Sequence, residues 1–426
     1  MSVLIGSIPN DKKDDVKLAK KLSKINFYKK STSLEELEAY FSEIFEDRSL
    51  FMFNRGRDSL YFLLKSLNIK REEEVIVQAF TCVATVSPIL WVHARPVYVD
   101  IDKETYNMDI SKLKEAITPK TRVIIVQHTF GNIADVYKVR EIVDEINKKR
   151  EEDKRISIIE DCCHLFYLTS QELEEKYVGI FSDAFFFSFA QDKAISCTQG
   201  SVCVVNNTKI FGKRKTEYAN IPELSKEDAK YNAKYIVTWN KIRKWYFVKV
   251  LPFIKSDKFT IGKFLILYYR ERGDIKKQAD NNTIYYDGIH KLSYIQASLL
   301  LHQLDKLEDL NEHRIVIENI YNKGLKKQFQ FKKEKGSVLL RYPIIVKNIE
   351  KIREALKKKK IIVGKWYSTP IFPLDYDELE KVNYKKGLCP NAESCGKKII
   401  NLPLSIDTTE EDAKNIVSII NKFAKQ

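Results

Sequence analysis

The sequence predicts an α/β protein with a mainly parallel central sheet in three layers, a small C-terminal α+β domain and a basic, aromatic-rich insertion. Between residues 74 and 206, short apolar runs alternate with longer helical stretches. Strands that are apolar on both faces and alternate with helices are typical of a parallel sheet covered on both sides. With 426 residues, the chain is long enough for more than one lobe. We expect an N-terminal segment (1–33), a large domain (34–208), the insertion (209–287), an inter-lobe helix region (288–336) and a small C-terminal domain (337–426).

The expected strands of the large domain are β-branched or aromatic runs bounded by polar residues. They lie at 75–77, 97–99, 123–126, 156–159 and 184–187. The helices that we expect around them lie at 34–45, 84–94, 109–117 and 134–149.

Beyond the insertion, apolar residues at helical spacing predict one long amphipathic helix over 295–310. The C-terminal domain is expected to have the order strand, helix, strand, strand, helix, at 338–346, 349–358, 361–363, 399–402 and 408–423. Its last helix opens with Thr408-Thr409-Glu410-Glu411, a capping-box pattern.

Composition excludes several classes of protein. Hydrophobic residues make up 44% and charged residues 31% of the chain, which excludes a disordered protein. No apolar run reaches the roughly 18 residues that a membrane span needs, and the N-terminus lacks the basic region of a signal peptide. The seven cysteines have no regular spacing, so we expect reduced thiols in a cytoplasmic protein. We expect no metal site, because no Cys/His cluster has zinc spacing and the adjacent Cys162 and Cys163 would point to opposite faces.

Three segments carry side chains that predict a chemistry. Asp161 lies just past the run 156–159, at the end of a strand where ligands bind in open α/β sheets. Lys193 follows a very apolar strand, a setting that favours Schiff-base formation, and Ser188 five residues earlier suits an anion. Gly56 opens a helix whose free N–H groups and positive dipole end suit a phosphate.

Together these residues match what pyridoxal phosphate (PLP) requires. A lysine forms an imine with the cofactor, an acid keeps the pyridine nitrogen protonated, and a helix end holds the phosphate. Taken singly, an aspartate after a strand is more often a loop residue and a lysine is more often on the surface. The order and spacing of the three signals favour the cofactor.

The sequence resembles the DegT/DnrJ/StrS family of PLP-dependent sugar aminotransferases, which have the aspartate-aminotransferase fold. The resemblance covers roughly residues 34 to 425, apart from the insertion. It rests on the motifs Glu160-Asp161-Cys162-Cys163-His164, Phe187-Ser188-Phe189-Ala190-Gln191-Asp192-Lys193 and Thr198-Gln199-Gly200-Ser201. Further similar segments are Glu74–Thr81, Val126–Gly131, Ile295-Gln296-Ala297, Cys389–Glu393 and Leu402-Pro403-Leu404.

This resemblance implies roles for individual residues. Lys193 would bind the cofactor covalently and shuttle the proton, and Asp161 would pair with the pyridinium nitrogen. His164 would lie beside the ring near its phenolic oxygen. Ser188, Gly56 and the backbone N–H groups of Arg57 and Asp58 would form the phosphate site, and Cys82 occupies the ring-stacking position. A lysine rather than a histidine at position 193 favours transamination over the dehydratase branch of the family.

Some positions depart from the family pattern. The phosphate turn reads Arg55-Gly56-Arg57 instead of Ser-Gly-Thr, and Cys82 replaces an aromatic residue. The segment Gly288-Ile289-His290-Lys291-Leu292 replaces the motif that reaches the neighbouring subunit, and Tyr367-Ser368-Thr369-Pro370 lacks the usual histidine.

The resemblance therefore implies a PLP-dependent aminotransferase of surface polysaccharide or glycan biosynthesis. It would transfer an amino group from an amino acid, with glutamate expected, to a nucleotide-linked keto-sugar, and it would act as a homodimer. Two alternatives stay open. One is a catalytically degenerate scaffold or regulator with this fold, and the other is a different PLP reaction.

The insertion concentrates positive charge. Residues 230–270 contain ten Lys or Arg and a single acid, Asp257, so they supply 10 − 1 = +9 of the net charge of +15. Interleaved aromatic residues suit contact with an anionic membrane surface. The alternative is that these aromatics pack on the body of the protein or at a dimer interface while the lysines face water. No nucleic-acid-binding motif accompanies them, so we expect no nucleic-acid partner.

Overall fold

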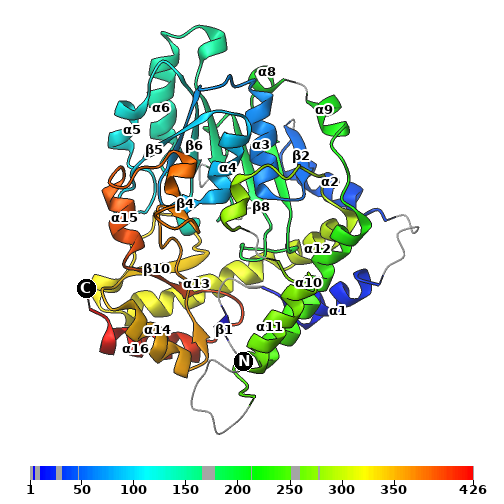
Figure 1. The fold of residues 1–426 in the computed structure, drawn as a ribbon, viewed down its shortest axis with the longest axis vertical. Helices are drawn as coiled ribbons and strands as arrows, with labels where there is room; N and C mark the ends of the chain where they lie inside the picture. Colours follow the sequence, from blue (N-terminus) through cyan, green and yellow to red (C-terminus); the bar gives the residue numbers. More distant parts are fainter. Residues whose placement is uncertain are drawn as a thin grey trace.

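The centre of the molecule is a seven-stranded sheet with the strand order β2-β9-β8-β7-β6-β3-β5 (Figure 1). The computed structural model describes residues 3–4, 10–24, 31–46, 48–165, 178–212, 214–250, 260–276 and 279–425. The strands from β8 to β5 run parallel, whereas β9 runs antiparallel to both of its neighbours, so the predicted mainly parallel sheet is confirmed. The strands are β2 Ser49–Phe53, β3 Glu74–Gln78, β5 Arg95–Val99, β6 Thr121–Gln127, β7 Ser157–Asp161, β8 Ala184–Ser188 and β9 Ser201–Val205.

Helices cover both faces of this sheet because alternate strand residues enter different apolar cores. In β3, Val75 and Val77 pack in one core with residues of α3 and α4. Ile76, between them, packs in a second core with residues of α5 and α6. A third core joins β8 and β9 to α1, α2, α10 and α12. These helices are α1 Lys13–Leu22, α2 Ser33–Ile44, α3 Gly56–Ser66, α4 Val83–Trp91, α5 Ile110–Ala116, α6 Val136–Asn147, α10 Lys226–Trp245 and α12 Tyr294–Leu304.

Two strands of the sheet, β2 and β9, were not expected from the sequence. β9 is the apolar run Ser201–Val205 directly after Gly200, and its five residues pair antiparallel with all five of β2. Strands of five residues carry little signal of their own, since their stability depends on packing against the neighbouring strands.

The prediction of one helix over 295–310 was wrong. The chain forms two helices, α12 and α13 (Leu307–Gly324), separated at Asp305 and Lys306. At this break the Lys306 amine ion-pairs with Asp14 (2.9 Å) and Asp15 (2.6 Å) of α1. The helical spacing of apolar residues continues through Asp305 and Lys306. The spacing alone therefore does not show the break or the ion pairs with α1.

The C-terminal residues form a smaller lobe beside the carboxyl ends of the sheet strands. β10 (Arg341–Ile345) pairs antiparallel with β13 (Ile399–Pro403), and the helix expected at 349–358 is α14 (Ile349–Lys358). β12 (Ile371–Phe372) pairs with β4 (Thr81–Cys82) and so brings this lobe to the large domain. The remaining elements are β1 Val3–Leu4, which pairs with β11 Ile361–Ile362, and the helices α15 Pro390–Gly396 and α16 Glu410–Phe423.

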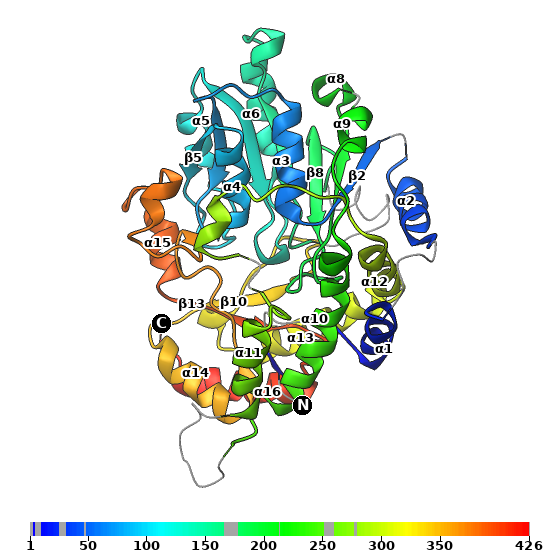
Figure 2. The ribbon, with the colours of Figure 1, turned by 45° about the vertical axis from the view of Figure 1, so that its right-hand side comes forward.

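The predicted insertion contains mostly helix. Its two long helices, α10 and α11 (Ile261–Glu271), pack against each other as a hairpin on the side of the molecule near α1 (Figure 2). Two short helices, α8 (Thr208–Phe211) and α9 (Lys215–Ala219), precede them. In the part of the chain that the structure describes, no helix is both long and apolar enough to span a bilayer. Short 3₁₀ turns lie at η1 Thr129–Gly131, η2 Glu152–Lys154, η3 Asn281–Ile284, η4 Lys327–Phe329 and η5 Leu379–Val382.

Candidate active site

A cavity of about 270 Å³ lies where the carboxyl ends of three neighbouring strands meet the smaller lobe. Gln127 ends β6, Asp161 ends β7 and Ser188 ends β8, and all three line the cavity. Ligands bind at this edge of open α/β sheets. The smaller lobe closes the opposite side with Arg341, Trp366, Tyr367 and Phe372.

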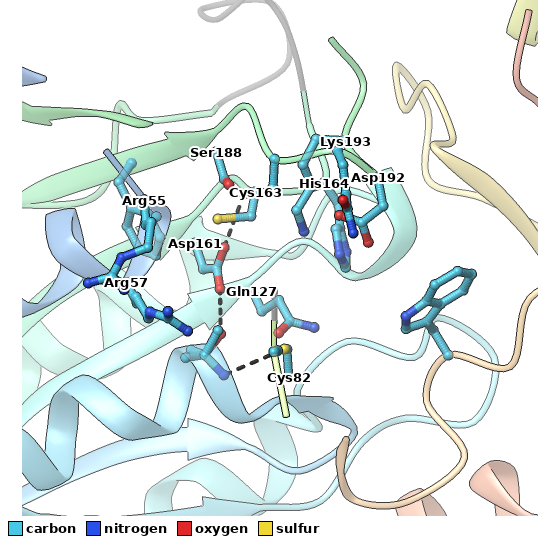
Figure 3. A pocket seen from close by; sticks show the side chains of 18 of the residues that line it. Arg55, Arg57, Cys82, Gln127, Asp161, Cys163, His164, Ser188, Asp192 and Lys193 are labelled. Carbon is cyan, nitrogen blue, oxygen red and sulfur yellow. Dashed lines mark hydrogen bonds between the residues drawn. The ribbon is translucent and has the colours of Figure 1, made fainter. Parts of the chain in front are cut away.

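Asp161 lies in the middle of the cavity floor (Figure 3). Its side chain is 3% exposed, and two donors fix it: the Thr85 hydroxyl at 3.0 Å and the Cys163 backbone N–H at 3.0 Å. Thr85 belongs to the first turn of α4, so the helix orients the carboxylate. A carboxylate held in this way is suited to pair with a protonated ring nitrogen.

The N-terminus of α3 approaches Ser188 at one end of the cavity. A Cβ atom built on Gly56 would lie 3.1 Å from the Ser188 Cβ and 3.2 Å from its Oγ, so a side chain here would require Ser188 to shift by a few tenths of an ångström. The guanidinium of Arg57 also lines the cavity, and burial together with the neighbouring Arg55 lowers its pKa. A hydroxyl, a helix N-terminus and a guanidinium therefore gather where an anion is best held.

Asp58 does not line the cavity with the other predicted residues. Its carboxylate pairs with Arg55 (2.8 Å), and its backbone N–H donates to the Arg55 carbonyl oxygen (3.0 Å). The predicted phosphate contact through the Asp58 amide is therefore not supported, because the helix already uses that donor. Arg55 in turn ion-pairs with Asp287 (2.6 Å).

Lys193 lies across the cavity from the anion end, beside Asp192 and His164 (Figure 3). Burial raises the pKa of Asp192, but the cations of Lys193 and Arg341 outweigh it and hold this pKa below its ordinary value. The Arg341 guanidinium donates to the Asp192 carbonyl oxygen at 3.1 Å.

His164 is a neutral, fixed residue of the wall. Its Nδ1 accepts the backbone N–H of Phe130 at 3.0 Å, so its proton is on Nε2, which lies 3.2 Å from the Tyr367 hydroxyl. Burial, with the nearby cations Lys193 and Arg341, lowers the pKa of His164 well below the ordinary value. His164 therefore offers a hydrogen bond without a charge.

Cys82 also lines the cavity and caps α4 by accepting the Ala84 N–H (3.5 Å). Burial raises its pKa, so the side chain is a neutral thiol. A sulfur atom here supplies a polarizable, apolar surface at the position where the family pattern has an aromatic residue.

The structure thus brings together seven of the eight predicted site residues and leaves Asp58 outside. No role was predicted for Thr85, Arg341 and Trp366. Gln127 and Asp192 were noted only as members of the similar segments Val126–Gly131 and Phe187–Lys193. Asp192 directly precedes Lys193, and Arg341 is a charge within the apolar run 338–346, which was the available signal for it.

Three buried potential metal ligands lie close together outside the cavity lining: His128, Glu160 and Cys162. The His128 Nε2 lies 2.9 Å from the Glu160 carboxylate, and its Nδ1 accepts the Ala134 N–H at 3.0 Å. Both ring nitrogens are therefore engaged within the protein, and the group is a satisfied polar pair of the core.

The donor set fits pyridoxal phosphate. One end supplies a hydroxyl, a guanidinium and a helix N-terminus for a phosphate, the floor supplies a carboxylate for a ring nitrogen, and the far side supplies the Lys193 amine. The close approach of Gly56 to Ser188 forms the anion cradle.

Comparisons with known proteins match the chain to a family of enzymes. A family model described as the DegT/DnrJ/EryC1/StrS aminotransferase family matches residues 9–235 and 268–421. GDP-perosamine synthase from Escherichia coli O157:H7 is 24% identical over 397 residues, which cover 92% of this chain and 91% of that protein. The spore coat polysaccharide biosynthesis protein SpsC of Bacillus subtilis (strain 168) is 21% identical, with 98% of this chain and 96% of that protein covered.

Solved structures share the fold. The PLP form of Spr1654 from Streptococcus pneumoniae superposes with a TM-score of 0.70 at 20% identity. The match covers 99% of this chain and 98% of that one.

Proposed function

We propose, because the chain belongs to the DegT/DnrJ/EryC1/StrS aminotransferase family, that it moves an amino group from an amino acid to the keto group of a nucleotide-linked sugar. PLP is the cofactor. The amino acid leaves as the 2-keto acid and the sugar leaves as the amino sugar, so atoms and charges balance over the two half-reactions. The similarity to a GDP-perosamine synthase supports a nucleotide sugar as substrate.

When bound, PLP supplies an electron sink that lets the amino group change carriers. The residues of this chain do the rest. The Lys193 amine holds the cofactor covalently and then moves a proton at the reacting carbon. Asp161, fixed by Thr85 and the Cys163 N–H, keeps the proton on the ring nitrogen. Ser188 and Arg57, beside the α3 N-terminus, bind the phosphate.

One observation carries this proposal: Asp161, Ser188 and Lys193 end or follow adjacent strands and line a single cavity. These three side chains would hold one cofactor at its ring nitrogen, its phosphate and its aldehyde carbon. The two alternatives left open by the sequence differ in whether they need these side chains. A scaffold has no need for a lysine and a carboxylate across one cavity. A different PLP reaction needs the same three groups and differs only in its product.

The test is reconstitution with PLP. Wild-type protein should gain a visible absorbance band that borohydride fixes onto Lys193, whereas Lys193→Ala should lose both. Lys120→Ala, at an exposed position, is the matched control. A wild-type protein that stays colourless at high PLP would favour the scaffold instead.

Product analysis then identifies the reaction and its donor. We propose glutamate as donor and a role in polysaccharide biosynthesis, which the similarity to SpsC supports. Coloured protein that converts amino acids but never aminates a nucleotide-linked keto-sugar would favour a different PLP reaction. We propose a cytoplasmic homodimer, and sedimentation at two protein concentrations tests the dimer.

The hairpin of α10 and α11 is our candidate for contact with an anionic membrane surface. Phe264, Leu267 and Tyr268 lie on one face of α11, and all three are at least half exposed. The family match omits residues 236–267, which include Phe264 and Leu267 of this face. Exposed basic side chains flank it: Lys241, Lys244, Arg270 and Arg272. Other residues of the hairpin fit the alternative that the segment packs on the body of the protein, since Tyr235 and Ile242 of α10 are buried.

Liposome co-sedimentation tests this contact. We expect pelleting with acidic but not with neutral vesicles, and loss of pelleting in a Phe264→Ser, Leu267→Ser double variant. Ile315→Ser with Val316→Ser removes similarly exposed apolar side chains from α13 and should leave pelleting unchanged. Equal pelleting on both lipids would overturn the proposal.

A further inference from the structure

Arg341 places a second cation in the cavity, on the wall that the smaller lobe supplies. It is the first residue of β10, is 2% exposed, and lines the cavity together with Lys193. The anion end formed by Gly56, Ser188 and Arg57 belongs to the large domain and is built separately. Burying a guanidinium costs free energy unless partners pair with its charge and accept its hydrogen bonds. The partners of Arg341 therefore indicate whether it is held by the protein alone.

The described partners of Arg341 accept only some of the hydrogen bonds that its guanidinium can donate. One terminal nitrogen, Nη2, donates to the Asp192 carbonyl oxygen (3.1 Å) and lies 3.4 Å from the Asp192 carboxylate. The guanidinium stacks over the Trp366 ring, with 4.0 Å from its central carbon to the ring centroid. The Trp366 backbone N–H is held in turn by the Asn401 side chain at 2.7 Å. Among the residues that the structure describes, the buried Arg341 Nε has no acceptor.

Charge on this wall is also unbalanced. Lys193 and Arg341 are two cations, and Asp192 is the carboxylate they share. Asp161 lies on the floor, where Thr85 and the Cys163 N–H hold it. A planar guanidinium that is stacked on an aromatic ring and whose Nε has no acceptor among the described residues is suited to bind a carboxylate.

The proposed reaction brings two kinds of anion to this cavity, and their chemistry separates them. In an amino acid the α-carboxylate is bonded to the carbon that gives up the amino group, so it must lie close to the Lys193 amine. In a nucleotide sugar the diphosphate is several bonds from the keto carbon. Arg341 contacts Asp192, the residue directly before Lys193. This position suits the α-carboxylate of the amino acid better than the diphosphate of the nucleotide sugar.

We propose that Arg341, oriented by Trp366 and Asp192, binds the α-carboxylate of the amino-acid donor. The assignment rests on the proposed aminotransferase function and deepens it. Arg341 is a binding residue here, and the proton transfer stays with Lys193.

The experiment follows the loss of the cofactor absorbance band when glutamate is added, in the absence of any sugar. Arg341→Gln should weaken the apparent affinity for glutamate about 10–100-fold, the range expected for a lost hydrogen bond to a charged group. Arg341→Lys should retain part of it. The matched probe is 4-aminobutyrate, which is glutamate without its α-carboxylate, and its slower reaction should be the same in wild type and variants.

A variant that fails to fold is recognised because it does not gain the PLP band. Trp366→Leu then serves as the second variant, since it removes the face that orients Arg341 without removing the charge, and it should also weaken glutamate more than 4-aminobutyrate. Equal glutamate affinity in wild type and Arg341→Gln, or equal losses with both probes, would overturn the assignment alone. A coloured wild type that responds to no amino acid would overturn the aminotransferase function and this assignment with it.

Discussion

Two clusters of buried charge in this molecule are built in opposite ways. In the cavity, Asp161, Lys193 and Arg341 come from separate elements, and Arg341 Nε has no acceptor among the described residues. In the last turn of α10, Arg243 pairs with Asp11 (2.9 Å) and with Asp407, and all three are largely buried (the Arg243 cluster). The cavity has a donor left for a ligand, whereas the groups of the Arg243 cluster pair with one another. We therefore expect changes in the cavity to alter binding and catalysis, and changes in the Arg243 cluster to alter stability.

The largest expected effect is on stability, from Arg243→Met. It removes the buried cation that Asp11 and Asp407 share, and breaking a buried pair by removing one partner costs about 3–5 kcal/mol. Urea unfolding measures the free energy, and Lys241→Met at an exposed position of the same helix is the control. If both variants unfold alike, Arg243 does not hold the hairpin to the N-terminal segment and the smaller lobe.

The next effect is on catalysis, from Asp161→Asn. The shape is kept but the negative charge opposite the ring nitrogen is lost, so kcat should fall by about 100–1,000-fold. The unfolding midpoint should change little. Thr85→Val removes only the 3.0 Å hydrogen bond that orients Asp161 and should cost about 10-fold or less. A Thr85 variant as impaired as Asp161→Asn would mean that orientation, rather than charge, dominates.

The third effect is on cofactor affinity, from Ser188→Ala. Loss of one hydrogen bond to a charged phosphate should weaken PLP binding about 10–100-fold, as measured by titrating the absorbance band. Ser87→Ala removes a buried hydroxyl that donates to the Val83 carbonyl oxygen, away from the cavity lining, and should leave PLP affinity unchanged. Equal affinities in wild type and Ser188→Ala would remove the hydroxyl from the anion end.

The same contrast explains what could be predicted from the sequence. Asp161, Ser188 and Lys193 are at or just past strand ends, so a local pattern of apolar runs was enough to find them and the parallel sheet. Arg341 and Trp366 reach the cavity only because β10 and the loop after β11 fold onto the large domain, a placement with no local signal. The break at Lys306 and the pairing of Arg243 depend likewise on the N-terminal segment, which had no informative pattern. The phosphate contact expected from the Asp58 N–H is not supported, because this donor bonds the Arg55 carbonyl oxygen at the start of α3, which the sequence does not show.

The smallest effect is on the pH dependence of stability, and it tests whether the groups of the Arg243 cluster depend on one another. Burial, together with the Asp407 charge, raises the pKa of Asp11 to about 8 in spite of Arg243. This folded value lies above the unfolded value of about 3.9, so the folded protein holds more protons between the two. Stability should therefore be greatest near the lower value and fall as the pH rises toward about 8.

Asp407→Asn should flatten this decline, because removing one of the two carboxylates leaves Arg243 to stabilise the ionised Asp11 alone. Unfolding free energies between about pH 5 and pH 8 measure the slope. Asp14→Asn is the control: Lys306 outweighs burial and lowers the pKa of Asp14 to about 2, so its contribution is lost only in more acidic solution and the slope in this window should not change. A slope that Asp407→Asn leaves as steep as in wild type would show that Asp11 does not share its cation with Asp407, and the contrast between the Arg243 cluster and the cavity would then fail.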